Sequence, residues 1–483
     1  MSLTARFFGF ENPTEQGLKL AKTMASLVPV FSMTFQISTT FYMLFIAEAL
    51  GDGDAVKGMA IVGGLVALQF IVQVILDYPT GAVGDWVGQR YVIMSALLCY
   101  AVVFFLTSQL TPDPPLILPI LIYALFGLGI SQESGAWGAW FDNNYRVAMP
   151  HDTKREEYGV FSGKLGMISQ ISATAVLVPG SWIALYLGRA WVFQLQALLF
   201  IVLAILVHRY VRDLPEVEEQ RSERPEMGDY VGLLKDGVRF IWSSKFFLLL
   251  FIGEMIFFSV GPVWGNLILW PFYNVYLQSD VAISTFRTLM FLPLAMTNER
   301  SGIIAKKYEP NTWIPRFRLF AFNGAAFYFL LSMMFFIVPP PPMGTTATVQ
   351  LVIPFINLPL FVLPIASVIP ILMIFIIFLI TSLFGSVGGI LTNRVLLDVV
   401  PNKIRNGMYS LRATSFTAAS IPLLVFFGWL VPSFGFSLAF LLMGIISTVG
   451  VVLIAMSFKQ DIPKAGDIEI EAVESEEVLE EIT

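Results

Sequence analysis

The sequence predicts an all-α integral membrane protein whose twelve transmembrane helices form two pseudo-symmetric six-helix bundles. Its mean hydropathy is +0.74 and 13% of its residues are charged, whereas a soluble domain typically carries about 25%. Apolar stretches recur that are long enough to cross a bilayer, which takes roughly 20 residues per helix. They lack the alternation of barrel strands, so helices remain the way to satisfy every backbone polar group inside a membrane.

The apolar stretches give twelve spans, six on each side of one long hydrophilic break. The first helix is too long for a signal peptide and lacks a small-residue cleavage site, so we expect it to be a true span. The predicted spans are 23–48, 58–83, 91–110, 116–141, 158–186, 189–209, 246–276, 281–304, 316–338, 366–394, 406–430 and 434–457.

This pattern divides the chain into four parts. Residues 1–209 and 246–457 are expected to form the two helix bundles, joined by a cytoplasmic linker at 210–245. Apolar residues at helical spacing within 228–242 predict an amphipathic helix that lies on the membrane surface. The acidic tail at 458–483 is expected to be solvated and disordered in the cytoplasm.

The positive charges predict that both termini are cytoplasmic. Of the 29 Lys and Arg residues, Lys57 and Arg189 fall in predicted external loops, and the others lie on the cytoplasmic side or at the cytoplasmic ends of spans, apart from four that are assigned to the spans themselves: Lys164, Arg287, Arg394 and Arg412. We expect the plasma membrane to be the location. One external stretch, 343–365, is apolar and broken by prolines, and both a re-entrant and an interfacial segment remain open for it.

Composition excludes several kinds of site. Two histidines, His151 and His208, and one cysteine, Cys99, cannot supply a disulfide framework or a Cys/His metal site. His151 lies outside the spans and His208 lies at the cytoplasmic end of span six, so neither is deep in the membrane, which argues against an intramembrane enzyme. The sequence contains no G-x-x-x-x-G-K-[ST] phosphate-binding loop, which argues against ATP as the energy source. We therefore expect no cofactor, no metal and no nucleic-acid partner.

The turn between spans two and three is the most unusual segment of the chain. Its sequence, D-Y-P-T-G-A-V-G-D-W-V-G-Q-R at 77–90, concentrates Gly81, Asp85, Gly88 and Arg90 within ten residues. Most membrane loops tolerate change as spacers, whereas glycines at such density allow a tight turn and close helix approach. This turn is therefore predicted to be a hinge.

A second pattern recurs in the two halves of the chain. Asp142 closes span four and is followed by G-V-F-S-G-K at 159–164, while Asp398 closes span ten and is followed by G-M-Y-S-L-R at 407–412. The hinge also has a weaker echo, because G-I-I-A-K-K after span eight stands where G-A-V-G-D-W stands after span two. Two matches at equivalent places indicate a duplicated transporter.

These motifs resemble the major facilitator superfamily, whose loop between spans two and three reads G-x-x-x-D-R-x-G-R-[RK]. Four positions match and two depart: Gly81, Asp85, Gly88 and Arg90 match, while Trp86 and Gln89 stand where the family has arginine. The resemblance covers nearly the whole chain. It implies two bundles that rock between inward-open and outward-open states.

The resemblance also implies roles for the charged residues of the hinge. Asp85 would stabilise the outward-facing state from a position near the start of span eleven, around Arg405 to Gly407, where a helix N-terminus favours a negative charge. Arg90 and Asp142 would form a companion ion pair. The alternative is a static turn that also keeps positive charge on the cytoplasmic side.

Ionisable residues within spans are costly in hydrocarbon and are therefore functional candidates. Glu133 and Lys164 enter neighbouring spans to a comparable depth and could pair, either as a helix clamp or in a proton or substrate role. Arg412 is the counterpart of Lys164 in the repeat, but Gly389 replaces the counterpart of Glu133. We therefore expect Arg412 to lack that partner and to contact an anion.

Two further charges lie about two turns inside spans, Glu254 in span seven and Arg287 in span eight. Glu254 is favoured over Glu133 as a proton carrier. Spans one, four, seven and ten line the cavity in the superfamily, and by that analogy Gln36 and Asn266 are substrate candidates. Hydrogen bonding between helices is the alternative for each polar group.

These observations predict a secondary active transporter that moves a small organic solute by alternating access, coupled to protons. A facilitative carrier, a carrier of an anion or lipid-like solute without proton coupling, and a non-transporting receptor or scaffold are the alternatives. The expected partners are a small-molecule substrate, protons and the lipid bilayer. The protein is expected to act as a monomer.

Overall fold

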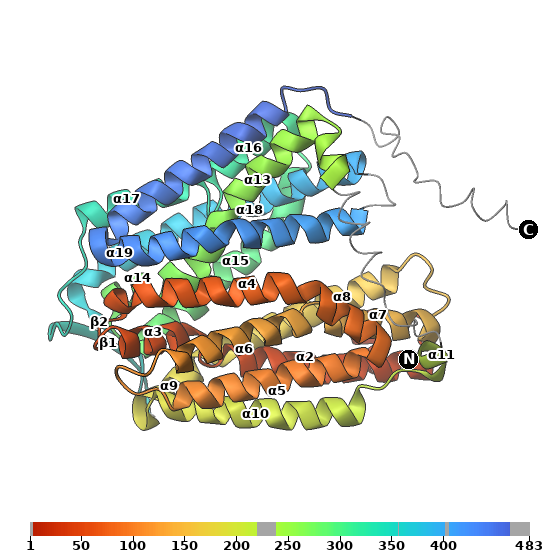
Figure 1. The fold of residues 1–483 in the computed structure, drawn as a ribbon, viewed down its shortest axis with the longest axis horizontal. Coiled ribbons are helices and arrows are strands. Elements are labelled where there is room, and N and C mark those ends of the chain that lie inside the picture. Colours follow the sequence, from red (N-terminus) through yellow and green to blue (C-terminus); the bar gives the residue numbers. More distant parts are fainter. Residues whose placement is uncertain (1–2, 220–237, 356, 401–404, 464–483) are drawn as a thin grey trace, which may run out of the picture.

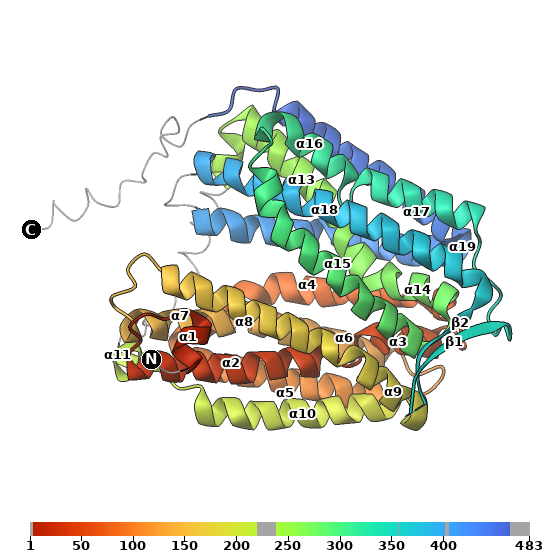
Figure 2. The same cartoon turned by 180° about the vertical axis from the view of Figure 1, so that it is seen from behind.

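A computed structural model describes residues 3–219, 238–355, 357–400 and 405–463. Long helices run side by side in two groups, one built from each half of the chain (Figures 1 and 2). The predicted helical fold with two bundles is confirmed. Most of the predicted surface helix at 228–242, and the acidic tail beyond residue 463, lie outside the described residues.

In the first half, several predicted spans consist of two consecutive helices, because the chain bends within the membrane. One such bend follows Gln36, and another follows Glu133. The elements are α1 (Leu3–Phe8), α2 (Glu15–Gln36), α3 (Thr39–Leu50), α4 (Ala55–Val87), α5 (Gln89–Ser108), α6 (Ile117–Glu133), α7 (Ala136–Ala148), α8 (Glu156–Ala175), α9 (Leu177–Leu187), α10 (Arg189–Tyr210) and α11 (Pro215–Glu219).

The second half repeats the pattern, with a π-helical turn, η1, where Pro262 interrupts span seven. Proline has no N–H to donate, and such turns are frequent at functional sites. The elements are α13 (Lys245–Val263), η1 (Trp264–Ile268), α14 (Leu269–Leu277), α15 (Asp280–Ala305), α16 (Pro310–Phe320), α17 (Ala325–Ile337), β1 (Thr348–Ile353), β2 (Leu358–Pro364), η2 (Ile365–Ser367), α18 (Val368–Val399) and α19 (Arg405–Ser457).

In the described part of the chain, ten helical stretches are long and apolar enough to cross a membrane. The last of them, Leu411–Ser457, contains Gly435 with φ 83°, a reversal that separates predicted spans eleven and twelve. The 26-residue helix α15 corresponds to predicted span eight. Each predicted span thus has its helix.

The two ends of the bundles differ. One end carries β1 and β2 and is called the hairpin end; the other carries α1, α7 and α11 and is called the Asp85 end (Figure 1). Towards the hairpin end, one hydrophobic cluster joins α3 and α4 to α14 and α19. Gly63 of α4 packs on Gly428 of α19 so closely that an added Cβ would lie 2.9 Å from the Gly428 Cα atom. The halves therefore touch through backbone there.

The stretch 343–365, for which the sequence allows a re-entrant or an interfacial segment, contains an antiparallel β-hairpin. Thr348 pairs with Pro364 and Ile353 with Leu358. The indole Nε1 of Trp182, on α9, donates a hydrogen bond to the carbonyl oxygen of Pro359 at 2.7 Å. The hairpin of the second half is thereby tied to the first half.

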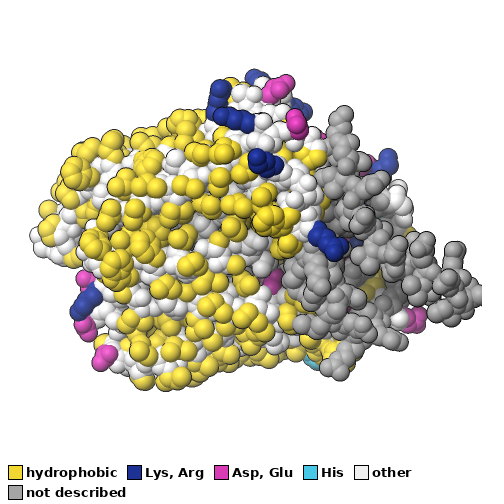
Figure 3. Space-filling view, turned by 45° about the horizontal axis from the view of Figure 1, so that its top comes forward, with side chains coloured by type: hydrophobic (Ala, Val, Ile, Leu, Met, Phe, Trp, Pro, Cys, Tyr) yellow, Lys and Arg dark blue, Asp and Glu magenta, His cyan; other side chains and the backbone are white. Residues whose placement is uncertain are grey.

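The surface supports the membrane assignment. A wide apolar area covers the face seen in Figure 3, and charged side chains lie towards its edges. Such a continuous apolar surface is far larger than a soluble monomer exposes. Lipid is the environment that it fits.

Candidate functional site

Polar contacts join the two halves at the hairpin end. Arg189, at the start of α10, donates to the Oε2 atom of Glu48 at 2.6 Å and to the Oδ2 atom of Asp280 at 2.7 Å. Deeper in the bundle, the hydroxyl oxygens of Thr40 and Ser284 lie 2.8 Å apart. Glu48, Arg189 and Thr40 belong to the first half, whereas Asp280 and Ser284 belong to the second. We call these five residues the hairpin-end seal.

Two adjoining cavities lie beside the seal. The larger, of about 470 Å³, is lined by helices of the second half, and the smaller, of about 250 Å³, lies between α3, α4 and α6 and the residues of η1 and α14. Gly265 in η1 lines both, so the two spaces adjoin at the π-helical turn. Pockets for small molecules typically measure roughly 300–1,000 Å³, so together they could hold a small organic molecule.

A buried ion cluster stands next to the larger cavity. Glu254 of α13 accepts from Arg318 of α16 at 3.2 Å and from Arg412 of α19 at 2.8 Å. Arg318 also donates to the hydroxyl of Thr392 at 3.1 Å. Only 2% of Glu254 and 4% of Arg318 are exposed. Arg318 lines the larger cavity as well, so the cluster and the cavity share a side chain.

The ion cluster bears on two expectations. The sequence predicts that Arg412 lacks the partner that the repeat would place at Gly389 and contacts an anion; the anion that it contacts is Glu254 of α13, on another helix. The sequence favours Glu254 as a proton carrier, but its carboxylate pairs with two guanidinium groups. Neutralising it would leave two buried arginines facing each other, which is costly. These contacts therefore favour a structural role for Glu254.

The predicted turn at 77–90 is shorter in the structure, because residues 77–87 continue α4 and α5 begins at Gln89, which leaves the reversal to Gly88. Gly88 has φ 102°, a conformation that side chains other than glycine rarely adopt. An added Cβ on Gly84 would lie 2.5 Å from the side-chain oxygen of Gln89. Gln89 in turn donates to the Oδ1 atom of Asp85 at 3.0 Å. Gln89, a departure from the family pattern, thus holds Asp85 within its own bundle.

The expected partners of Asp85, around Arg405 to Gly407, lie outside the side chains that the structure describes. The role of Asp85 in the outward-facing state therefore stays a prediction. Gly81, the first glycine of the motif, has open space where a Cβ would be added.

The predicted ion pair between Arg90 and Asp142 is not formed. Asp142 accepts instead from Arg146 at 2.8 Å and from Arg155 at 2.6 Å. Arg90 donates to the hydroxyl of Tyr91 at 2.6 Å. Arg146 stands one helical turn from Asp142 on α7, so it competes for the carboxylate at little conformational cost.

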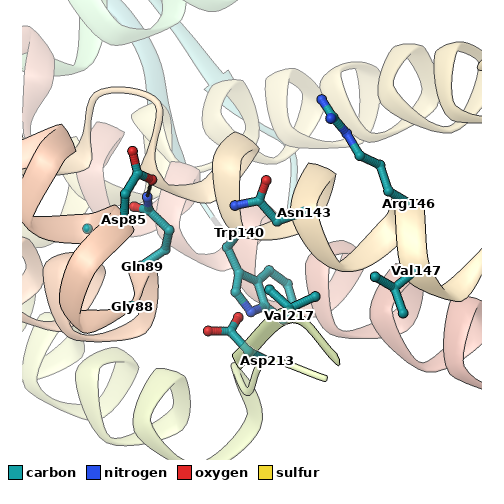
Figure 4. A pocket seen from close by; sticks show the side chains of 10 residues that line it. Asp85, Gly88, Gln89, Trp140, Asn143, Arg146, Val147, Asp213 and Val217 are labelled. Atoms are coloured by element: carbon teal, nitrogen blue, oxygen red, sulfur yellow. Dashed lines mark hydrogen bonds between the residues drawn. The ribbon is translucent and has the colours of Figure 1, made fainter. Parts of the chain in front are cut away.

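A third cavity, of about 380 Å³, lies at the Asp85 end. Figure 4 shows Asp85 and Gln89 on one side of it, and Trp140, Asp213 and Val217 on another. All of its lining residues come from the first half of the chain and from the segment after α10. It therefore does not lie between the two halves.

The predicted ion pair between Glu133 and Lys164 is also not formed. The Lys164 ammonium donates to the backbone oxygen of Phe7, because α1, a helix outside the predicted spans, reaches this lysine. Glu133 has no hydrogen bond or ion pair with a described residue. It ends α6, just before Gly135, which takes φ 81° and separates α6 from α7. Thr80 braces this break by donating to the backbone oxygen of Ser131 at 2.8 Å.

Sequence and structure comparisons agree with this architecture. The profile of the Major Facilitator Superfamily matches residues 24–358, well over half of the chain. The chain belongs to the major facilitator superfamily. It is therefore a multi-pass membrane transporter and not an enzyme.

Several solved structures share the superfamily fold with this chain. The crystal structure of nucleoside transporter NupG has 14% identity and a TM-score of 0.64, over 92% of this chain and 100% of that one. A D-xylose-proton symporter has 12% identity and a TM-score of 0.60, over 93% and 98%. A bacterial homolog of the human lysosomal transporter Spinster, inward-facing and unoccupied, has 10% identity and a TM-score of 0.61, over 91% and 96%.

These identities show a common fold alone. No curated protein is similar enough in sequence to be matched with this chain. The substrate of this superfamily member must therefore be argued from its own residues.

The remaining candidates of this superfamily member take different places. Arg287 of α15 lines the larger cavity, and Asn266 of η1 lines the smaller one. Gln36 does not line either cavity, because the chain bends directly after it. Ser38, just past the bend, lines the smaller cavity and donates to Gln196 of α10 at 2.7 Å.

Arg318 is a candidate site residue that the sequence pattern does not single out. Span nine was predicted to begin at residue 316, which left Arg318 at its cytoplasmic edge among the positive charges there. The helix begins at Pro310 instead, so Arg318 lies two turns inside it. Proline is common at the first position of a helix, and this signal would have extended the span and flagged a buried charge.

Proposed function

We propose that this protein is a secondary active transporter that moves a small organic solute across the membrane by alternating access, using protons as the coupling ion. The hairpin end would face the outside, and the Asp85 end would face the cytoplasm with both termini. The structure would then represent a state closed to the outside. The observation that carries the proposal is the hairpin-end seal beside the two central cavities.

The distribution of contacts supports this state. The hydrogen bonds and ion pairs seen between described residues of the two halves lie at the hairpin end: Arg189 with Asp280, Thr40 with Ser284, and Trp182 with Pro359. A rocking bundle that opens this end would have to break them. The orientation rests on the bias of Lys and Arg towards the Asp85 end.

Glu133 is the better proton carrier of the two acids, Glu133 and Glu254. Unlike Glu254, it faces no described counter-ion, so it can gain or lose a proton without stranding an arginine. It also stands at the break between α6 and α7, and broken helices commonly form coupling-ion sites in secondary transporters. An ionisable group in this setting is a functional candidate by default.

Crosslinking of the seal tests alternating access. In a background in which the single cysteine, Cys99, is replaced by alanine, Thr40→Cys and Ser284→Cys would be introduced together and oxidised. Ser332→Cys with Ser437→Cys is the matched control, because those hydroxyl oxygens lie 3.3 Å apart within the second half. A crosslink across the seal should stop transport, whereas the control crosslink should leave it intact.

The readout is counterflow in proteoliposomes with a panel of radiolabelled organic anions, nucleosides and sugars. Loss of counterflow on oxidation of the seal pair alone, with recovery on reduction, supports the proposal. Counterflow that continues through the crosslinked seal would overturn it, as would the absence of counterflow for every class of solute.

Replacement of Glu133 by Gln tests the coupling. Flux driven by an imposed pH gradient should be lost, while exchange at equal pH should persist. Glu309→Gln, which removes an exposed carboxylate at the start of α16, is the matched control. Gradient-driven flux that survives in the Glu133 variant would refute the coupling assignment while leaving alternating access untouched.

A further inference from the structure

The larger cavity is positively charged. Arg287 from α15 and Arg318 from α16 both line it, and no described carboxylate lines either this cavity or the smaller one. A cation inside a membrane bundle is expensive unless an anion compensates it. The two arginines in the wall of the larger cavity therefore indicate that a molecule bound there is negatively charged.

Arg318 is only partly satisfied by its protein partners. Its Nη2 atom donates to Glu254 and to Thr392. Its Nε atom is buried and has no hydrogen-bond partner among the described residues. A guanidinium group carries five N–H donors, and a buried donor left without an acceptor costs free energy. This side chain is thus short of an acceptor at the cavity wall.

Arg287 has no counter-ion in the described part of the chain. It forms no hydrogen bond or ion pair there, although it lies inside α15 and is partly buried. Glu254 is shared between Arg318 and Arg412. Three guanidinium groups and one carboxylate leave two positive charges in excess around the larger cavity.

The remainder of the cavity wall is aromatic. Phe258 lies under the Arg318 guanidinium, 4.7 Å from ring centre to Cζ. Trp264 and Phe322 pack edge to face with centroids 6.4 Å apart, and Phe378 packs on Phe322 at 5.0 Å. Rings of this kind bind planar or apolar molecules with little loss of side-chain entropy. The cavity therefore offers cations at one place and an apolar surface beside them.

We propose that the solute is an organic anion, whose negatively charged group binds Arg287 and Arg318 and whose apolar body lies against Trp264 and Phe322. Guanidinium groups bind carboxylate and phosphate through paired, charge-assisted hydrogen bonds, so both headgroups fit this chemistry. The inference rests on the proposed transport function, because it names the class of solute for the same cavity.

Binding to the purified full-length protein tests the inference without any transport measurement. Isothermal titration would compare 1-naphthoate and 1-naphthyl phosphate, which differ in headgroup, with neutral 1-naphthamide and cationic 1-naphthylmethylamine. At least one of the two anions should bind. The neutral and cationic analogues should bind at least about tenfold more weakly than that anion, because they cannot accept charge-assisted hydrogen bonds from the guanidinium groups. Preference for one anion identifies the headgroup.

Arg287→Gln is the diagnostic variant, because Arg287 holds no ion pair whose loss would unfold the protein. It should weaken binding of the preferred anion by at least about tenfold. Arg300→Gln, an exposed arginine on the same helix, is the matched control and should bind like the parent. Equal binding of 1-naphthamide, or unchanged binding by the Arg287 variant, would overturn the inference.

The two proposals can fail separately. Anion binding that depends on Arg287, in a protein with no counterflow of any solute, would leave the anion site standing and refute transport. Counterflow of sugars or nucleosides, with anions neither binding nor competing, would leave transport standing and refute the anion site.

Discussion

Replacement of Glu254 by Gln should destabilise the protein strongly. Its carboxylate lies 3.2 Å from Arg318 and 2.8 Å from Arg412, and at these distances each pair gains roughly 5–6 kcal/mol of attraction before solvation costs, with an effective dielectric constant of about 20. The cluster has one excess positive charge, and the variant would have two. Removal of one partner of a buried ion pair typically costs about 3–5 kcal/mol, and we expect a loss of that size.

Arg412→Gln is the matched comparison. It leaves Glu254 paired with Arg318 and the cluster neutral, so it should cost clearly less than Glu254→Gln. The double variant restores the present net charge and should recover part of the loss. Denaturant unfolding in detergent, followed by tryptophan fluorescence, would measure all three. The reasoning fails if Glu254→Gln unfolds like the parent, or if Arg412→Gln is the more damaging change.

Three other predictions concern the contacts that hold the present state. Gly63→Val should push α4 away from α19, at a cost of about 1–3 kcal/mol for overpacking. Labelling of Gln69→Cys by an impermeant maleimide from the hairpin side should then become faster. Gly64→Val is the control, because an added Cβ there meets nothing within 4 Å, and it should leave the labelling rate unchanged. Trp182→Phe keeps the ring but removes the bond to the hairpin, so hydrogen exchange in β2 should accelerate, and unchanged exchange would contradict the tie. Burial tends to raise the pKa of Asp152, but hydrogen bonds, chiefly from the Tyr158 N–H, hold it below its ordinary value. Because the pKa of Asp152 is lower in the folded protein, its ionised form stabilises the fold above the pKa of the unfolded state, and this stabilisation is lost as the pH falls through the folded-state pKa. Between about pH 5 and about pH 3, where aspartate titrates, the melting temperature should therefore drop more in the parent than in Asp152→Asn. Equal drops in both proteins would refute the prediction.

The helices could be predicted from sequence because lipid requires every span to be apolar and to satisfy its backbone hydrogen bonds internally. Apolar length and internal hydrogen bonding decide each helix locally, so hydropathy was sufficient for all of the spans. The β-hairpin at 348–364 was not predicted. It lies outside the spans, where that requirement does not apply and where pairing between two strands decides the structure.

The pairing of charges could be predicted far less well. The repeat placed Arg412 within a span, but it could not show that Glu254, on a helix distant in sequence, would be its partner. Arg90 and Asp142 were paired by resemblance, and Arg146 was the nearer competitor. Which neighbour a charged side chain pairs with depends on their distance and on the cost of desolvation, and the sequence alone does not give those distances.

The two charge clusters differ in how easily they can be broken, and this difference fits their places. The side chains of Arg189, Glu48 and Asp280 are 20%, 31% and 16% exposed, against 4% and 3% for Arg318 and Glu254. Water reaches the seal more easily, and the contribution of an ion pair falls towards about 0–1 kcal/mol as it becomes solvent-exposed. In the proposed transport cycle this seal would open at every turnover, and a shift of a two-state population from about 1:99 to about 99:1 requires about 5.5 kcal/mol in total. A seal as strong as the Glu254 cluster would consume most of that free energy and trap one state. The weak seal therefore suits the moving interface, while the strong cluster suits the interior of a bundle that moves as one body.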